Sequence, residues 1–260
     1  MTLALVGACD APIEGAPADP PRILASTPSP GQEGVSRTGP FRITFDRRLN
    51  PASVHRGNVH IESGIAGSLL SVRFDVVDMA IVAVPFYGGP IEPEVVHRLT
   101  VADVRDLDGI ALAEPYLVPF RTGTEATPLP PPMRAAWSDA QPIFAAHCAG
   151  TGCHGSSGPS EGLVLDSALG VRETAVGAAA RELPQAGGGE GTRVETGLGG
   201  MRIVDVVAGV GRPATSYLMY KVLDDPHIVG SAMPPAPAEP LDDDAIRVLD
   251  AWILAGAPTD

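Results

Sequence analysis

A proline-rich stretch at residues 125–134 divides this chain into two parts whose sequence patterns differ, so no single regular architecture fits both. Before it, short apolar runs alternate with Pro, Gly and Ser turns. FRITF (41–45) alternates apolar and polar residues, as in a strand with one buried face. After it, DDDAIRVLDAWILAG (242–256) repeats apolar residues at helical spacing. The stretch itself, EATPLPPPMR, predicts a semi-rigid linker.

Residues 21–124 are predicted to form an all-β sandwich, because six or seven runs of strand length separated by turns occupy about 100 residues. This part resembles the bacterial Ig-like domains of S-layer and envelope proteins. The resemblance rests on STPSPGQEGVSRTGPFRITFDRRLNPASV at the start and HRLTVADVRDLDGIALAEPYLVPFRTG at the end. DLDG (106–109) lacks the ligand spacing of a calcium loop and predicts a turn between strands.

The first residues, MTLALVGACD, resemble the end of a bacterial lipoprotein signal, which would be cut before Cys9 and leave that cysteine lipidated. An ordinary N-terminus with a chance cysteine is the alternative. Residues 1–20 are then a signal remnant and a Pro/Ala-rich tether. No run reaches about 18 apolar residues, so we expect membrane attachment through the lipid anchor only. The predicted location is exported, in the periplasm or the outer cell envelope.

The charge distribution excludes one class of partner. The formal net charge is −13 and Lys221 is the only lysine, whereas nucleic-acid binding needs clustered Lys and Arg. Residues 127–260 alone carry 16 acidic against 8 basic residues. This acidity fits a solvated surface, or the docking of a redox partner protein with a basic face.

The second part, residues 135–260, is predicted to be mainly α. WSDAQPIFAAHC (137–148) predicts a helix capped by Ser138, with Gln141 completing a capping box. ATSYLMYKVL (214–223) and the closing run at 242–256 predict two more helices. AGGGEGTRVETGLGG (186–200) predicts a mobile loop.

HCAGTGCHG (147–155) contains two of the three cysteines, followed at once by a histidine. Haem c attachment needs two thiols and a histidine directly after the second, usually with two residues between the cysteines. Here four residues separate Cys148 from Cys153, and two of them are glycines that would let the extra length bulge outward. The motif therefore predicts an expanded attachment site with His154 beside the iron.

The order of elements resembles small mono-haem cytochrome c-like domains at the ends of bacterial envelope proteins. The matching segments are IFAAHCAGTGCHG, SYLMYKVL and SAMPPAPAEPLDDDAIRVLDAWILAGAP. The resemblance implies one covalent haem c on Cys148 and Cys153, with His154 as proximal and Met233 as distal iron ligand. Among other distal candidates, Met201 and Met219 are less suitable, and His227 is the runner-up.

Three alternatives compete with haem. A Cys148–Cys153 disulfide is chemically easy in an exported protein. A zinc site could use these cysteines with His154 and His147 or His227, but a second paired cluster is missing. An enzyme is disfavoured, because GVGRPATS (209–216) lacks the Gly-Lys-Ser/Thr of a phosphate loop and no second haem motif exists.

Together these patterns predict an extracytoplasmic electron-transfer protein that binds one haem with His/Met ligation and converts no substrate. Its parts would be an Ig-like sandwich (21–124), a linker (125–134) and a cytochrome c-like domain (135–260). The proline-rich linker predicts that the two domains behave independently. The alternative from another class is a haem-free structural or adhesion lipoprotein with a Cys148–Cys153 disulfide.

Overall fold

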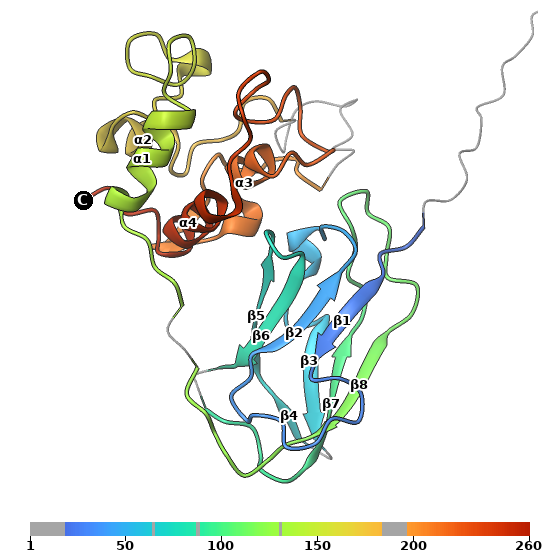
Figure 1. The fold of residues 1–260 in the computed structure, drawn as a ribbon. Coiled ribbons are helices and arrows are strands. Elements are labelled where there is room, and N and C mark those ends of the chain that lie inside the picture. The colour runs from blue at the N-terminus through green and yellow to red at the C-terminus, as the bar shows by residue number, and fades with distance from the viewer. Residues whose placement is uncertain (1–18, 64–65, 87–88, 130–131, 184–196) are drawn as a thin grey trace, which may run out of the picture.

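The computed structural model describes residues 19–63, 66–86, 89–129, 132–183 and 197–260. An N-terminal β-sandwich is followed by a mixed region with four helices (Figure 1). Cys9 and most of the glycine-rich segment 186–200 lie outside the described residues.

The sandwich consists of two four-stranded antiparallel sheets, with strand orders β1-β2-β6-β5 and β4-β3-β7-β8. Its strands are β1 (Ile23–Thr27), β2 (Phe41–Phe45), β3 (Val59–Ser63), β4 (Ala66–Ser68), β5 (Leu70–Asp75), β6 (Ala80–Pro85), β7 (Val96–Val101) and β8 (Tyr116–Arg121). The predicted alternation in β2 is confirmed, because Phe41, Ile43 and Phe45 are completely buried. The two inner faces meet in a core of aliphatic and phenylalanine side chains.

DLDG forms the turn that the sequence predicts. Asp106 closes it, since one of its carboxylate oxygens accepts hydrogen bonds from the amides of Asp108 (3.1 Å) and Ile110 (2.8 Å). Gly109 has φ +83°, a conformation that glycine adopts at little cost. The turn thus presents the side chain of Asp108 from a rigid backbone.

The C-terminal region contains α1 (Trp137–His147), α2 (Ala168–Thr174), α3 (Tyr217–Val222) and α4 (Asp243–Leu254). Short strands β9 (Val206–Val207) and β10 (Val210–Gly211) pair with each other, and single 3₁₀ turns lie at Ser160–Gly162 and Pro213–Thr215. Long irregular segments join these elements, so the region is less helical than predicted.

Aromatic packing holds α1 against α4. The Phe144 ring meets Trp252 edge-on with centroids 5.5 Å apart, and Trp137 lies 5.9 Å from Phe144. α1 begins at Trp137 with Ala136 at its N-cap, so the predicted cap at Ser138 is wrong. The carboxylate of Asp139 instead accepts a hydrogen bond from the amide of Ala136 at 2.7 Å.

Ion pairs join the C-terminal region to the sandwich. Arg48, which follows β2, contacts Asp225 at 2.9 Å, and Arg247 of α4 contacts Asp78 at 2.8 Å. The amide of Gly197 also donates to the carbonyl of Leu107 at 2.7 Å. The prediction of independent domains is therefore incomplete, because direct contacts join them besides the linker. Figure 1 shows α3 and α4 at one end of the sandwich, close to β5 and β6.

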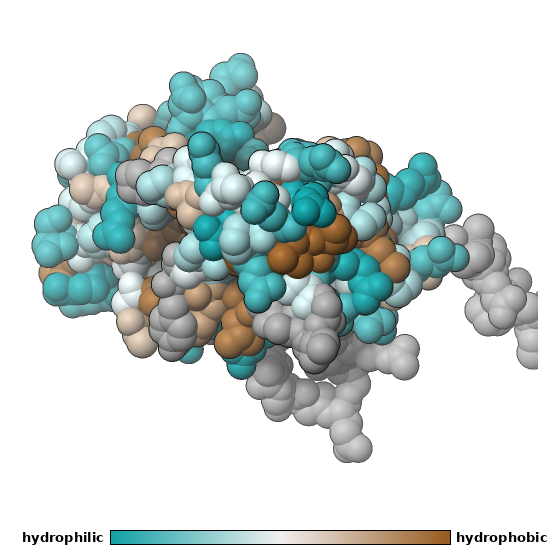
Figure 2. Space-filling model, turned by 90° about the horizontal axis from the view of Figure 1, so that it is seen from below, coloured by the Kyte–Doolittle hydropathy of each residue, from teal (hydrophilic) through white to brown (hydrophobic). Residues whose placement is uncertain are grey.

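The opposite end of the sandwich is seen in Figure 2, where apolar residues gather within a mainly hydrophilic surface. Exposed apolar side chains of the sandwich include Leu69 and Phe86, which adjoin because the Phe86 amide donates to the Leu69 carbonyl at 2.8 Å. Among the residues that the structure describes, no helix is both long and apolar enough to cross a membrane.

Candidate functional site

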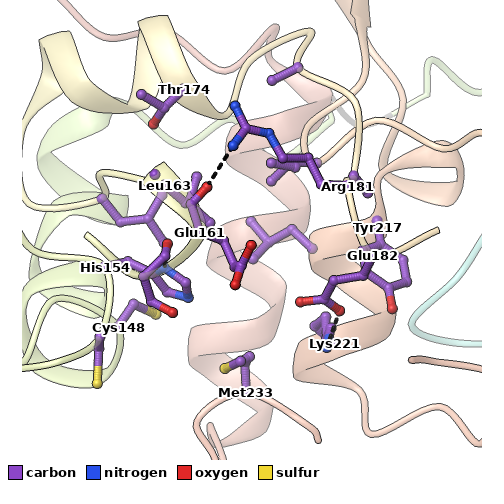
Figure 3. A pocket seen from close by; sticks show the side chains of 18 of the residues that line it. Cys148, His154, Glu161, Leu163, Thr174, Arg181, Glu182, Tyr217, Lys221 and Met233 are labelled. Atoms are coloured by element: carbon purple, nitrogen blue, oxygen red, sulfur yellow. Dashed lines mark hydrogen bonds and ion pairs between the residues drawn. The ribbon is translucent and has the colours of Figure 1, made fainter. Parts of the chain in front are cut away.

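A cavity of about 460 Å³ lies within the C-terminal region, inside the size range of small-molecule and cofactor sites. Cys148, Cys153, His154 and Met233, the residues that the sequence predicts to hold haem, all line it. Its apolar lining comes from Leu163, Leu165, Ile203 and Leu218. The structure thus brings the four predicted residues together around one largely apolar space (Figure 3).

The end of α1 places the cysteines. Cys148 directly follows the helix, and its amide donates to the carbonyl of Phe144 at 2.9 Å. The chain then loops out and returns, since the amide of His154 donates to the carbonyl of Cys148 at 2.9 Å. Gly152, with φ +79°, supplies the left-handed residue of this bulge, as the sequence predicts for one of its glycines.

Gly155 completes the turn for a steric reason. A Cβ at this position would lie 2.7 Å from the carbonyl oxygen of Ala149, too close for any other residue without movement of the backbone. The amide of Ser156 donates to Asp166 at 2.6 Å, and this hydrogen bond holds the pKa of Asp166 below its usual value. His154 therefore lies in a turn that is closed by hydrogen bonds.

The ring of His154 is oriented through its backbone-side nitrogen. Nδ1 lies 3.3 Å from the carbonyl oxygen of Ser160, a distance at which Nδ1–H donates a hydrogen bond. A ring held in this way presents Nε2 as the nitrogen that could bind a metal, which is the usual arrangement of a ligating histidine. Figure 3 shows the ring directed toward the interior of the cavity.

Met233 reaches the cavity on a loop anchored to α3. Its amide donates to the carbonyl of Lys221 at 2.9 Å. The ammonium of Lys221 donates to the carbonyls of Val229 (2.6 Å) and Ser231 (3.1 Å) of the same loop. It also pairs with Glu182 at 2.7 Å, and its side chain is only 8% exposed. The only lysine of the chain thus fixes the segment that precedes Met233.

The other distal candidates lie elsewhere. Among the described residues that line the cavity, Met233 is the only methionine, and Met201 and Met219 are buried outside it. His227 does not line it either. Its two ring nitrogens contact Asp225 at 2.8 Å and Asp108 at 3.2 Å. The geometry therefore favours Met233 over the runner-up.

Both cysteines are free thiols in this structure. Burial, and secondarily the nearby Cys153, raises the pKa of Cys148 to about 11, so this thiol is protonated at neutral pH. Within the part of the chain that the structure describes, no three His, Cys, Asp or Glu side chains come together as metal ligands.

Sequence reasoning did not identify the charged groups of the cavity wall. Arg181, Glu182 and Lys221 line it, and Arg181 donates to the carbonyl of Glu161 at 3.3 Å (Figure 3). Their spacing along the chain forms no motif. The only available signal was the single lysine in an acidic chain, which sequence analysis used only to exclude nucleic acid.

Comparison with known protein families matches the sandwich but not the residues that line the cavity. Residues 17–122 match the family described as "Bacterial Ig-like domain". No curated protein matches the chain.

Solved structures with similarity include surface layer protein SbsC, domains 1–6 (14% identity, TM-score 0.33), and the S-layer protein rSbsC(31-844) (13%, TM-score 0.33). Each match covers 46% of this chain and 17% of the other. The N-terminal part of SbsC matches at 13% identity and TM-score 0.33, over 45% of this chain and 28% of that one. This chain therefore spans less than a third of the S-layer proteins that it matches.

Proposed function

We propose that this protein is an extracytoplasmic electron carrier, in which an Ig-like sandwich supports a region that binds one covalent haem c. Cys148 and Cys153 would hold the porphyrin, and His154 and Met233 would bind the iron from its two sides. When bound, the haem supplies an iron that accepts and releases one electron. No substrate is converted, so the protein is not an enzyme under this proposal.

One observation carries the proposal: the cavity collects Cys148, Cys153, His154 and Met233, and no other described methionine. These residues are up to 85 positions apart in sequence (from 148 to 233), so a local pattern cannot account for their convergence. Thiol, imidazole and thioether are the donors that c-type haem sites use. The cavity volume and apolar lining suit a flat, mostly apolar cofactor.

The chain's own residues have separable tasks in this proposal. The Ser160 carbonyl orients His154, so that the ring presents Nε2 to the iron. Lys221 and the Met233 amide fix the methionine loop, which matters because a thioether is a weak ligand that requires a preset position. Methionine ligation favours the ferrous iron and raises the potential. Leu163, Leu165 and Leu218 line the cavity and would shield a bound haem from water.

The test is expression of the full chain in a host with c-type maturation, followed by a pyridine haemochrome spectrum after acid-acetone extraction. Colour that survives extraction, at one haem per chain, is expected. Cys148→Ser together with Cys153→Ser should abolish it, while Gln141→Ala is the control because Gln141 lies in α1, is exposed and does not line the cavity. A colourless wild-type protein from that host would rule out the proposal.

The alternative is a haem-free structural protein of the envelope with a Cys148–Cys153 disulfide. It predicts a colourless protein that contains no thiol titratable in this region after oxidation. The Ig-like match supports an exported location in either case. Lipidation at Cys9 and docking of the acidic C-terminal region to a basic redox partner stay predictions.

A further inference from the structure

The loop that carries Met233 is clamped at two places. At its base, the Met233 amide and the Lys221 ammonium close it onto α3. At its outer turn, the side chain of Asp225 is only 2% exposed. Its two carboxylate oxygens bond to different partners. One accepts from the amide (2.9 Å) and ring (2.8 Å) of His227, while the other accepts from Arg48 of the sandwich at 2.9 Å.

The sandwich supplies the second clamp from rigid positions. Arg48 also donates to the carbonyl of Val76 at 3.3 Å, and its side chain is 16% exposed. Asp108 lies in the turn closed by Asp106 and accepts from the His227 ring at 3.2 Å. Two separate sandwich loops therefore contact the same short turn of the C-terminal region.

The buried Asp225 makes this clamp more than a surface contact. A carboxylate with so little exposure needs partners for its charge, and the structure places the Arg48 guanidinium on one oxygen and the His227 ring on the other. Without Arg48, Asp225 would have to turn toward solvent, and the turn 225–228 would move with it. Only five residues separate His227 from Met233, so such movement reaches the sulfur position.

We infer that Arg48 and Asp108 of the Ig-like sandwich are positioning residues for Met233, and so set how fully methionine occupies the distal side of the iron. This inference rests on the proposed haem function. It gives the sandwich a role in tuning the redox centre beyond that of a spacer. Electron transfer itself still takes place at the iron.

The experiment measures full-length holoprotein for haem content, for the far-red sulfur-to-iron charge-transfer band of the ferric form, and for midpoint potential. Arg48→Ala is expected to keep its haem, lose most of the band and shift to a lower potential. Arg48→Lys should retain part of the band, because it keeps the charge. Asp108→Ala removes one contact of an exposed side chain and should give a smaller shift of the potential in the same direction. It is the substitute test if Arg48→Ala fails to fold.

Two controls separate this clamp from general effects. Arg98→Ala breaks an exposed sandwich ion pair with Glu62 and should change nothing. Arg247→Ala weakens another contact between the regions, away from the loop, and should leave the band intact. The inference is overturned if Arg48→Ala and Asp108→Ala leave band and potential unchanged, or if Arg247→Ala changes them equally. Wild-type protein without covalent haem overturns the proposed function and this inference together.

Discussion

The two regions of this molecule differ in how their interiors are filled. The sandwich fills its interior with its own side chains, among them Phe41, Phe45 and Phe120, and pairs its strands in two regular sheets. The C-terminal region arranges four helices and long irregular segments around a cavity of about 460 Å³. We expect the first region to be stable without a ligand, and the second, under the proposed haem function, to gain part of its stability from the haem that the cavity would hold.

The strongest test of this contrast removes Cys148 and Cys153, the two residues proposed to hold the haem. Cys148→Ser with Cys153→Ser should leave the C-terminal region largely unfolded at temperatures where the sandwich is intact, because a ligand that binds only the folded state adds its binding energy to stability. Both tryptophans of the chain, Trp137 and Trp252, lie in this region, so tryptophan fluorescence reports on it separately. Hydrogen exchange of the β-strand amides then follows the sandwich. Coincident, unchanged transitions in both signals would show that the cavity needs no occupant.

The converse change attacks the sandwich. Phe45→Ala deletes a completely buried ring of β2 and should cost the sandwich about 3–5 kcal/mol of unfolding free energy. The unfolding transition of the strand amides, followed by hydrogen exchange, should move to lower urea while the tryptophan transition moves little. Leu24→Ala is the control, because that side chain is 65% exposed and its loss should change stability by less than about 0.5 kcal/mol. An equal shift of the tryptophan transition would mean that the two regions unfold as one unit.

A third change concerns α4, where it faces the sandwich. Burial, and secondarily the charge of Asp75, raises the pKa of Asp250 from 3.8 to about 6, and one of its oxygens has no hydrogen-bond partner. Asp78 raises this pKa as well, whereas Arg73 and Arg247 lower it. A carboxyl with a raised folded-state pKa costs nothing below its unfolded value and destabilises increasingly as pH rises from about 4 through about 6.

Asp250→Asn should therefore raise the unfolding free energy of the C-terminal region by up to about 3 kcal/mol at pH 7 and hardly at all at pH 4. The measurement is the urea midpoint of the tryptophan transition at both pH values. Glu239→Gln makes the same chemical change at an exposed site and should have no comparable effect. A gain of equal size at pH 4 and pH 7 would contradict the linkage argument.

The same contrast explains what the sequence could predict. The strands of the sandwich follow local alternation, so FRITF locates β2 to the residue. HCAGTGCHG and the Met-Pro-Pro segment could be selected as candidate site residues because each forms a recognisable local sequence pattern. Lys221 was not, since its role depends on the approach of residues 229–231 to α3 in space. Likewise Arg48 and Asp225 are 177 positions apart, and no local period links them. The cap at Ser138 failed because α1 begins one residue earlier, with Ala136 at the N-cap and the Asp139 carboxylate accepting from the Ala136 amide.

The smallest expected effect concerns the contact of Arg247 with Asp78, which tests whether the two regions are coupled by charge. Arg247 and Asp78 are 47% and 34% exposed at their side chains, and pairs of this kind contribute about 0.2–1 kcal/mol. Arg247 lowers the pKa of Asp78, so the contribution is present at neutral pH and is lost as pH falls through that lowered pKa. Arg247→Ala should bring the two unfolding transitions slightly further apart at low salt.

In about 1 M salt, where screening acts within about 3 Å, wild type and Arg247→Ala should become indistinguishable. The matched control is Arg98→Ala, whose ion pair lies wholly within the sandwich. A separation of the transitions that persists in high salt would mean that apolar packing between α4 and the sandwich couples the regions. The two interiors would still differ in how they are stabilised. The contact surface between α4 and the sandwich would then contribute to the stability of both regions.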